Sequence, residues 1–338
     1  MSDVRLDAAL SQGLIPAPDG VRTLVVGAGA SSALARDFDT AVFVQPIQPD
    51  YDKLVAMGRE VLPDVPAPGT APFDLAIIAI PRARARAQDW IARAAKLLGP
   101  DGLLIVDGAK TDGIDSHWRV LRGRLDTPES LTKAHGRLFR GRRGSGSFED
   151  LAASPTVAGV GFRTAAGVFS ADGIDPGSAA LAAALPPKLP ARVADLGAGW
   201  GWLSAQILAC NGVEQLDLVE ADHVALSAAR DNVTDPRASF HWTDATTWRP
   251  ATPLGAVVMN PPFHTGRAGD PNLGRAFIAS AAAALAPQGQ LWLVANRHLP
   301  YEAMLETQFR DWQEVDGSSA FKILHASRPR QTRKGASR

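Results

Sequence analysis

A glycine-rich turn, Asp-Leu-Gly-Ala-Gly-Trp-Gly at residues 195–201, follows a short apolar run that is typical of a buried strand. We predict a strand over 192–196 and a helix that begins after the turn. Glycine allows the backbone to turn tightly and to approach a ligand closely, and the free N–H groups at the start of a helix carry partial positive charge. Gly197, Gly199 and Gly201 are therefore expected to bind a ligand that carries a negative group.

Acidic residues accompany three neighbouring predicted strands. Asp195 lies just ahead of the first glycine, Glu220 ends a strand predicted over 216–219, and Asp244 follows a strand predicted over 239–242. The carboxyl ends of parallel strands share one edge of the sheet, where ligands bind. A carboxylate at Glu220 can accept hydrogen bonds from both hydroxyls of a ribose, and Asp244 or an amide beside it can pair with the edge of an adenine.

The next predicted strand, 255–260, ends in Asn260-Pro261-Pro262-Phe263. The two prolines fix φ and leave carbonyl groups without a competing N–H, so the loop is stiff and rich in acceptors. The matching target is the NH2 of a nucleobase, whose lone pair is delocalised into the ring. If the Asn260 side-chain oxygen and the Pro261 carbonyl each accept one hydrogen, that lone pair can attack a methyl group, and catalysis consists mostly of positioning and electrostatics.

Two aromatic side chains end the same loop. Phe263 offers a flat face to a base taken out of its stack, and such stacking is worth roughly 1 to 3 kcal/mol per base. His264 either contacts the substrate or merely completes the loop, and both interpretations stay open.

The same landmarks occur in the same order in the first half of the chain. In each half a strand ends in Gly-Ala-Gly, a second strand is stopped by proline, and a helix leads to a third strand. The predicted segments are 22–27, 73–80, 85–98 and 103–107 in the first half and 192–196, 255–260, 275–285 and 290–295 in the second. This alternation is typical of an α/β fold with a largely parallel sheet, and its repetition predicts two similar domains. Unrelated parallel-sheet domains that share these landmarks are the alternative.

Length and composition agree with two globular domains. The 338 residues are 46% hydrophobic and 21% charged, which excludes wholesale disorder. The small, polar stretch 141–154 is typical of an exposed connection. We therefore expect domains at 1–150 and 151–330, followed by a basic tail at 331–338.

Several classes of protein are not expected from this sequence. No apolar run approaches the roughly 18 to 20 residues that cross a bilayer, and the N-terminus lacks the layout of a secretion signal, so a cytoplasmic protein without membrane contact is expected. The single cysteine, Cys210, cannot form an internal disulfide. The seven histidines show no zinc-binding spacing, so no metal is expected.

Basic residues are clustered although the chain has 35 basic and 35 acidic residues. The stretch 117–146 contains eight Lys or Arg against two acids, among them Arg140, Arg142 and Arg143, and six more basic residues lie in the last seventeen positions. Such clusters can contact phosphates. A solvated basic surface with a frayed tail is the alternative.

At these residues the chain resembles the class I methyltransferases that act on amino groups. More narrowly, it resembles the bacterial 16S ribosomal RNA guanine-N2 methyltransferases, which consist of two tandem Rossmann-like domains. The resemblance extends over nearly the full length. Beyond the glycine turn and the Asn-Pro-Pro-Phe-His loop it is carried by Gly167–Ser170, Asp172–Asp175 with Gly177-Ser178, Lys133–Gly136, and Phe321-Lys322.

The resemblance implies an α/β fold in which the second domain binds S-adenosylmethionine and methylates guanine, while a degenerate first domain helps to bind RNA of the small ribosomal subunit. We expect a monomer. The implied catalytic residues are Asn260, Pro261 and Phe263; the implied cofactor-binding residues are Asp195, Gly197, Gly199, Gly201, Glu220, Asp244 and Asn260; the implied substrate-binding residues are Phe169, Phe263, His264, Lys322, Arg140, Arg142 and Arg143.

The first half departs from this pattern at the positions that would carry chemistry. Its Ile80-Pro81-Arg82-Ala83 is interpreted as the counterpart of the Asn260 loop and lacks both the amide and the aromatic ring. Its glycine turn lacks the preceding acid, because Val26 is interpreted as the counterpart of Asp195.

Other functions remain open. The same tetrapeptide can serve methylation of adenine N6 or of a protein glutamine, although the segment around Phe169 and the Phe in place of Tyr separate the chain from the glutamine enzymes. The chain can also be a non-catalytic RNA-binding or ribosome-assembly protein, against which the set of Asp195, Glu220 and Asn260 argues. A nicotinamide oxidoreductase is disfavoured by the glycine spacing.

Overall fold

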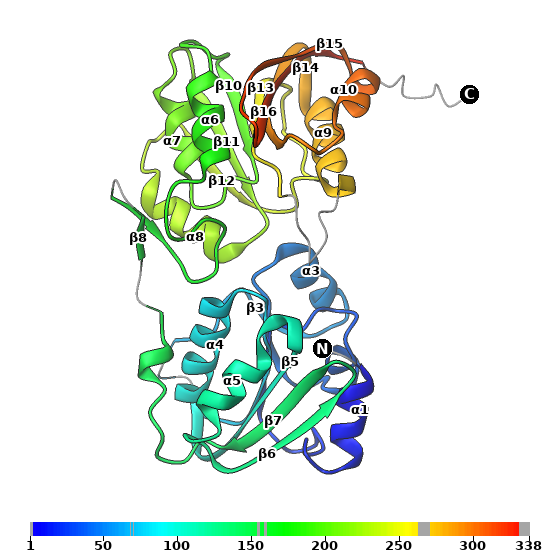
Figure 1. Ribbon diagram of the computed structural model, residues 1–338, viewed down its shortest axis with the longest axis vertical. Coiled ribbons are helices and arrows are strands. Elements are labelled where there is room, and N and C mark those ends of the chain that lie inside the picture. Colours follow the sequence, from blue (N-terminus) through cyan, green and yellow to red (C-terminus); the bar gives the residue numbers. More distant parts are fainter. Residues whose placement is uncertain are drawn as a thin grey trace, which may run out of the picture. The chain divides into compact units, whose positions relative to one another are not determined.

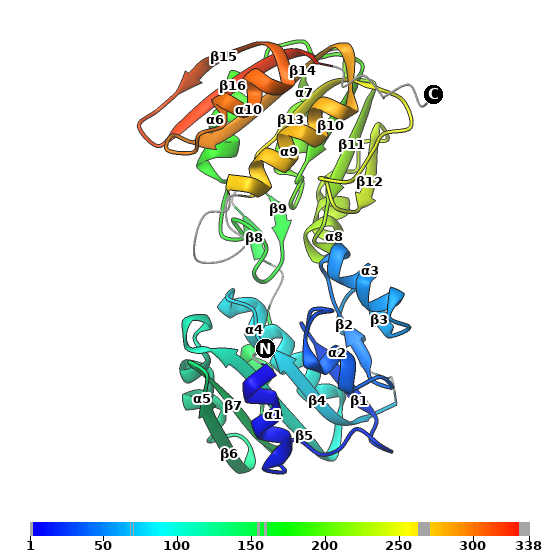
Figure 2. The same ribbon diagram turned by 90° about the vertical axis from the view of Figure 1, so that its right-hand side faces the viewer.

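The computed structural model describes residues 3–67, 69, 71–153, 156–158, 161–262 and 271–330. The chain forms two compact units, Met1–Thr156 with Ala165–Ala171 and Val157–Thr164 with Asp172–Arg338. Each unit is a seven-stranded sheet with helices on both faces (Figures 1 and 2).

The described residues of the first unit form five α-helices, two 3-10 turns and a seven-stranded sheet. Its helices are α1 Asp3–Ser11, α2 Ala33–Asp37, α3 Gln48–Ala56, α4 Arg84–Leu97 and α5 Ile114–Leu121, with η1 Lys110–Asp112 and η2 Glu149–Leu151. Its strands are β1 Thr23–Val26, β2 Val42–Val44, β3 Glu60–Leu62, β4 Phe73–Ala79, β5 Leu98–Ala109, β6 Asp126–Lys133 and β7 Gly136–Arg142.

The described residues of the second unit likewise form five α-helices and a seven-stranded sheet. Its helices are α6 Pro176–Ala184, α7 Trp202–Ala209, α8 His223–Asn232, α9 Pro271–Ala284 and α10 Glu302–Gln308. Its strands are β10 Arg192–Leu196, β11 Gln215–Glu220, β12 Ala238–Trp242, β13 Leu254–Met259, β14 Leu285–Asn296, β15 Phe309–Gly317 and β16 Phe321–Pro329. Strands β8 Thr156–Ala158 and β9 Phe162–Thr164 form a separate pair.

The two large sheets have the same topology. The strand order is β3-β2-β1-β4-β5-β7-β6 in one and β12-β11-β10-β13-β14-β16-β15 in the other. In both, the first five strands along the chain are parallel and the last two are antiparallel, and both contain a register irregularity between their fourth and fifth strands in chain order. The predicted duplication of an α/β domain is therefore confirmed, and the sheets are mixed only at one edge.

Alternating residues of each central strand face two separate cores, as the period of two in a strand requires. In β1, Leu24 and Val26 pack with α4 and α5, whereas Val25 packs with α1 and α2. In the second unit, Leu196 of β10 packs with α9 and α10, whereas Val193 packs with α6, α7 and α8. Both faces of each sheet are thus covered, which leaves the strand ends as the place for ligands.

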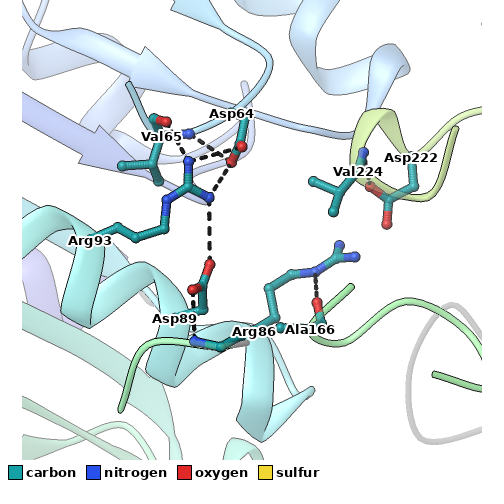
Figure 3. Close-up of polar contacts among 9 residues, drawn as sticks. Asp64, Val65, Arg86, Asp89, Arg93, Ala166, Asp222 and Val224 are labelled. Carbon is teal, nitrogen blue, oxygen red and sulfur yellow. Dashed lines mark hydrogen bonds and ion pairs between the residues drawn. The ribbon is translucent and has the colours of Figure 1, made fainter. Parts of the chain in front are cut away.

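The boundary between the units is more complex than a single cut at residue 150. The segment Ala165–Ala171 belongs to the first unit. Arg86 of α4 donates from Nε to the Ala166 carbonyl at 3.2 Å (Figure 3), and Val168 is buried. These contacts join residues far apart in the sequence, so the composition of the stretch 141–154 could not reveal them.

A buried ion pair anchors the N-terminal helix in the first unit. Arg5 of α1 is bidentate on Asp107 of β5, with Nη2 to Oδ2 at 2.8 Å, and both side chains are almost fully buried. Its Nη1 also donates to the Lys133 carbonyl at 3.0 Å. A methyl group at Gly136 would lie 2.4 Å from Arg5 Nη1, so this glycine is required by the arginine. The Lys133–Gly136 motif therefore has a structural role in this fold.

Among the described residues no helix is long and apolar enough to cross a bilayer.

Candidate active site

The predicted site residues of the second unit gather where β10, β11, β12 and β13 end. These strands are hydrogen-bonded neighbours in parallel register. Their carboxyl ends therefore bring together the glycine turn, Glu220, Asp244 and Asn260, as the sequence predicted for a parallel sheet.

The three glycines of the turn have left-handed backbone conformations, and the turn is hydrogen-bonded to β11. Gly197, Gly199 and Gly201 have φ of 79°, 56° and 89°, which disfavours side chains at all three. The Gly197 N–H donates to the Val219 carbonyl at 2.8 Å. A methyl group at Gly201 would lie 3.0 Å from Val233, whereas one at Gly199 would meet nothing within 4 Å. Gly201 thus permits helix packing, and Gly199 borders open space.

Glu220 connects the second strand to that turn. Its Oε2 accepts from the Gly199 N–H at 2.9 Å and its Oε1 from the Asp222 N–H at 2.8 Å. Burial raises the pKa of Glu220, and the two backbone N–H groups oppose that shift. An ionised carboxylate has about four acceptor positions, so two remain for the hydroxyls of a bound ribose.

Asp195 lies beneath the turn. Its side chain is fully buried, and Oδ2 accepts from Ser204 Oγ of α7 at 2.6 Å. Burial raises the pKa of Asp195 to about 7; the bond from Ser204 opposes this shift and the charge of Glu220 adds to it. In this geometry Asp195 ties β10 to α7 through Ser204, a partner that the sequence did not single out.

Asp244 opens the loop after β12. Its Oδ1 accepts from the Thr246 N–H at 2.8 Å and from Thr246 Oγ1 at 2.7 Å. Ser280 Oγ of α9 donates to the Ala245 carbonyl at 2.6 Å, which ties this loop to the neighbouring helix. The loop is therefore held in place beside the Glu220 strand.

Asn260 follows β13 and has a defined amide orientation. Its Nδ2 donates to Asp175 Oδ2 and to Ser178 Oγ, each at 2.8 Å. The amide nitrogen is therefore saturated, and the amide oxygen is the group left to act as acceptor. Pro261 is buried beside it. The expected residues Phe263 and His264 lie outside the described residues, as does the basic tail 331–338.

Asp175 and Ser178 were missed as site residues. They were quoted only within a family segment, yet Asp-Pro-Gly-Ser is a helix N-terminus signature, with a capping acid followed by proline at the first helical position. In the structure Asp175 caps this helix, because its Oδ2 accepts from the Ser178 N–H at 2.7 Å. That the cap faces Asn260 depends on the tertiary fold.

Two expected substrate contacts have different surroundings. The Lys322 side chain is 4% exposed and forms an ion pair with Glu302. Burial raises the pKa of Glu302, but the hydrogen bond and charge of Lys322 together with backbone N–H groups outweigh it, so the pKa of that carboxyl is lowered. Phe169 belongs to the first unit and is 63% exposed. Lys322 is thus a charge within the fold, whereas Phe169 presents its ring at the surface.

The expected basic cluster is partly neutralised by its own neighbours. Arg140 is paired with Glu129 at 2.7 Å and donates to the Gly13 carbonyl, and Arg142 lies 4.0 Å from Asp101. Arg143 has no carboxylate partner among the described residues. The assignment of these arginines to RNA binding stays a prediction.

In the first unit the counterpart of the glycine turn is filled by protein. A methyl group at Gly27 would lie 2.4 Å from the Trp90 ring of α4, whereas at Gly197 the nearest atom would be on Phe277 at 3.5 Å. The nearest group to a methyl at Gly29 would be the Asp50 carboxylate at 3.5 Å, which would repel an anionic ligand. The first turn is therefore degenerate as a binding site.

The second strand of the first unit carries an amide where the other carries an acid. Gln45 follows β2 as Glu220 ends β11. Its Oε1 accepts from the Ile47 N–H at 3.1 Å, but its Nε2 donates to the Ala28 carbonyl at 3.2 Å. The amide thus preserves the connection to the turn without the charge that binds a ribose.

The sheet register corrects two counterparts assigned from sequence. Ile78 pairs with the last residue of β1, as Met259 pairs with the last residue of β10. The next residue, Ala79, is therefore the counterpart of Asn260. The assignment of Ile80 was wrong by one residue. The error arose because the loops were matched at their first prolines.

The second correction concerns the glycine turn. Val25, two residues before Gly27, is the counterpart of Asp195, and Val26 was wrong by one residue. Both true counterparts are apolar, so the absence of the acid and of the amide in the first unit is unchanged.

These folds and the arrangement of the second site define a class I methyltransferase with two tandem Rossmann-like domains, the first degenerate. Residues 159–325, just under half of the chain, match the family model of the methyltransferase small domain.

Relatives and a solved structure agree with this class. The chain is 38% identical over 168 residues to "Ribosomal RNA large subunit methyltransferase G" of Ectopseudomonas mendocina, covering 48% of this chain and 45% of that protein, so the match spans about half of the relative's length. It is 28% identical over 267 residues to "Ribosomal RNA small subunit methyltransferase C" of Shewanella baltica, covering 75% of this chain and 76% of that one.

The structure of the T. thermophilus 16S rRNA N2 methyltransferase RsmC, solved with AdoMet and guanosine, is similar with a TM-score of 0.78 at 25% identity. It covers 93% of this chain and 92% of that one.

Proposed function

We propose that the protein transfers a methyl group from S-adenosylmethionine to the exocyclic N2 amine of a guanine in small-subunit ribosomal RNA. The observation that carries this proposal is the orientation of Asn260, whose nitrogen is saturated by Asp175 and Ser178. An acceptor pair formed by the Asn260 amide oxygen and the Pro261 carbonyl suits an NH2 group. The likeness to RsmC over both domains supports guanine as the base and small-subunit RNA as the substrate.

The residues of the second domain fit S-adenosylmethionine. Open space borders Gly199, where the amino-acid end of the cofactor can approach the backbone. Glu220 would hold the ribose, and the loop at Asp244 would contact the adenine. When bound, the cofactor supplies a methyl group on a positively charged sulfur.

The chain's own residues bind and orient the amine. The Asn260 amide oxygen and the Pro261 carbonyl accept its two hydrogens, which favours a pyramidal nitrogen with an exposed lone pair. Positive charge that develops on the nitrogen is stabilised by the same two oxygens, and prolines 261 and 262 keep them fixed. No strong base is required, because the amine proton becomes acidic once nitrogen has four substituents.

Methylation is proposed to occur on an unpaired guanine. In a duplex the N2 amine is hydrogen-bonded and stacked inside the helix, so the base must be splayed out to reach the site. Arginines of the first domain are proposed to bind the flanking phosphates. Arg84, Arg119 and Arg122 are exposed and, within the described part of the chain, pair with no carboxylate.

Incubation with labelled S-adenosylmethionine and small ribosomal subunits or their naked RNA tests the proposal. Label is expected in RNA, and mass spectrometry should place it on N2 of one guanine. Calorimetry should give one cofactor site per chain, and Glu220→Gln should weaken it. Label only in protein, or on adenine N6, would contradict the assignment.

Methylation of large-subunit RNA is the second candidate, favoured by the 38% identity of the catalytic half to a large-subunit enzyme. Parallel reactions with both subunits from a strain that lacks the protein separate the two, since only the true substrate has an unmethylated target.

A further inference from the structure

The N-terminus of α6 contacts the side chain of Asn260 across the sheet edge of the second domain. Asp175 Oδ2 and Ser178 Oγ each lie 2.8 Å from Asn260 Nδ2. Asp175 is separated from Asn260 by 85 residues along the chain. The fold therefore brings two acceptors to one amide nitrogen.

The chemistry of these partners determines which way the amide points. A side-chain amide can rotate by 180° and exchange its oxygen and nitrogen. An ionised carboxylate only accepts hydrogen bonds. In the rotated state the Asn260 oxygen would face the Asp175 carboxylate, and both groups would be acceptors. The observed orientation is therefore strongly favoured.

The two acceptors are themselves fixed. Asp175 Oδ2 also accepts from the Ser178 N–H at 2.7 Å, and Pro176 stands at the first helical position. Gly177 is buried, and a methyl group there would lie 3.0 Å from Asp175 Oδ2 and 3.4 Å from the Phe321 ring. A larger residue at position 177 would therefore push against both the capping carboxylate and β16.

We infer that Asp175 and Ser178 are positioning residues, which hold Asn260 so that its oxygen faces the substrate amine. The effect of this positioning on catalysis rests on the proposed function, whereas the orientation of the Asn260 amide is independent of it. Without the carboxylate, the rotated state becomes populated. In that state the amide nitrogen presents hydrogens to the hydrogens of the substrate amine, so a fraction of the enzyme cannot accept them.

Side-chain NMR tests the orientation without any substrate. The chain has only five asparagines, Asn211, Asn232, Asn260, Asn272 and Asn296. Selective 15N-asparagine labelling therefore gives five amide pairs, and Asn260→Asp identifies the pair of interest. Asn232 is an internal control, since its Nδ2 donates to the Arg163 and Trp200 carbonyls, each at 2.7 Å.

The key variants are Asp175→Ser, which keeps a capping hydroxyl but removes the carboxylate, and Ser178→Ala. We expect solvent exchange of the Asn260 amide protons to rise about tenfold in Asp175→Ser, because a charge-assisted hydrogen bond is lost. The Asn232 signals should not move. Asp175→Asn should restore much of the protection, since its amide oxygen can occupy the place of Oδ2.

Kinetics provide the second readout. In Asp175→Ser, kcat should fall about tenfold or more, while KM for RNA and the Kd for S-adenosylmethionine stay within about twofold; Asp175→Asn should recover part of kcat. Ser32→Ala removes a capping hydroxyl of α2 in the other domain and serves as the matched cap control.

The outcomes separate the inference from the proposed function. Unchanged Asn260 signals in Asp175→Ser, or loss of cofactor affinity equal to the loss of kcat, would overturn the positioning role. If the signals respond as expected but the wild-type protein methylates no guanine, the orientation stands and the proposed function falls.

Discussion

Asp195 makes the second domain sensitive to pH. Its pKa is raised to about 7 by burial, from 3.8 for a free carboxyl. A raised pKa means that the folded state binds the proton more tightly, so its contribution to stability is complete below about pH 4 and is lost as the pH rises through 7. The loss is at most about 4 kcal/mol.

Asp195→Asn should remove this dependence, because the amide stays neutral and can still accept from Ser204. Urea unfolding of the full chain at pH 6 and pH 8.5 measures how the free energy of unfolding changes with pH. The wild-type second domain should lose stability between these values and the variant should lose less. Parallel pH profiles for the two proteins would show that Asp195 does not titrate in this range.

Asn260→Ala should reduce turnover far more than cofactor affinity. The substitution removes one of two acceptors that stabilise charge on the amine, and loss of one such group costs about 100- to 1000-fold in kcat. The glycine turn and Glu220 are untouched, so calorimetry should give nearly the same Kd for S-adenosylmethionine. Equal losses in both quantities would contradict the role given to the amide.

At the level of elements, α9 depends on a glycine that faces a buried tyrosine. A methyl group at Gly274 would lie 1.8 Å from the Tyr301 hydroxyl oxygen, and Tyr301 is fully buried. Alanine favours a helix over glycine by roughly 0.5–1 kcal/mol, but overpacking costs about 1–3 kcal/mol. Gly274→Ala should therefore destabilise the protein.

Thermal unfolding checks this prediction, with Gly123→Ala as the control, because a methyl group at Gly123 meets nothing within 4 Å. A Gly274→Ala protein as stable as the control would mean that Tyr301 moves aside at little cost.

Strands that form a clear apolar run could be predicted from sequence, whereas the polar edge strands β6 and β15 could not. Apolar runs such as 73–80 and 255–260 became β4 and β13 with small shifts, because buried parallel strands are nearly continuous hydrophobic runs. β6 is exposed along most of its length and β15 is largely polar, so neither pattern stood out. The helix expected at 275–285 begins at Pro271.

The site was predictable to the extent that it follows strand ends. Glu220 and Asn260 could be placed because each directly follows an apolar run. The burial of Asp195 and the ion pair of Lys322 could not, since both depend on how a strand packs against a neighbouring helix, through Ser204 of α7 and Glu302 of α10.

For the whole molecule, RNA affinity should depend on which arginines are free. Replacing Arg84, Arg119 and Arg122 together with glutamine should weaken binding and lower the salt slope by about 2 if each contacts one phosphate. Arg140 is already paired with Glu129, so the triple replacement that includes it, with Arg142 and Arg143, should have a smaller effect.

Filter binding across a salt series measures both triple variants, with methylation of free guanosine as a control for an intact site. If replacing Arg140, Arg142 and Arg143 weakens binding as much as or more than replacing Arg84, Arg119 and Arg122, the phosphate contacts are made by the 140–143 cluster instead.

The assignment of Ala165–Ala171 to the first unit, with Val157–Thr164 in the second, means that the polypeptide passes from one unit to the other three times. No single protease nick can release either half whole. A fragment that starts at residue 151 takes along two segments of the first unit, 151–156 and 165–171, and a fragment that stops at 150 leaves them behind. Dissecting the protein into working halves would require a rewired connection rather than a simple truncation.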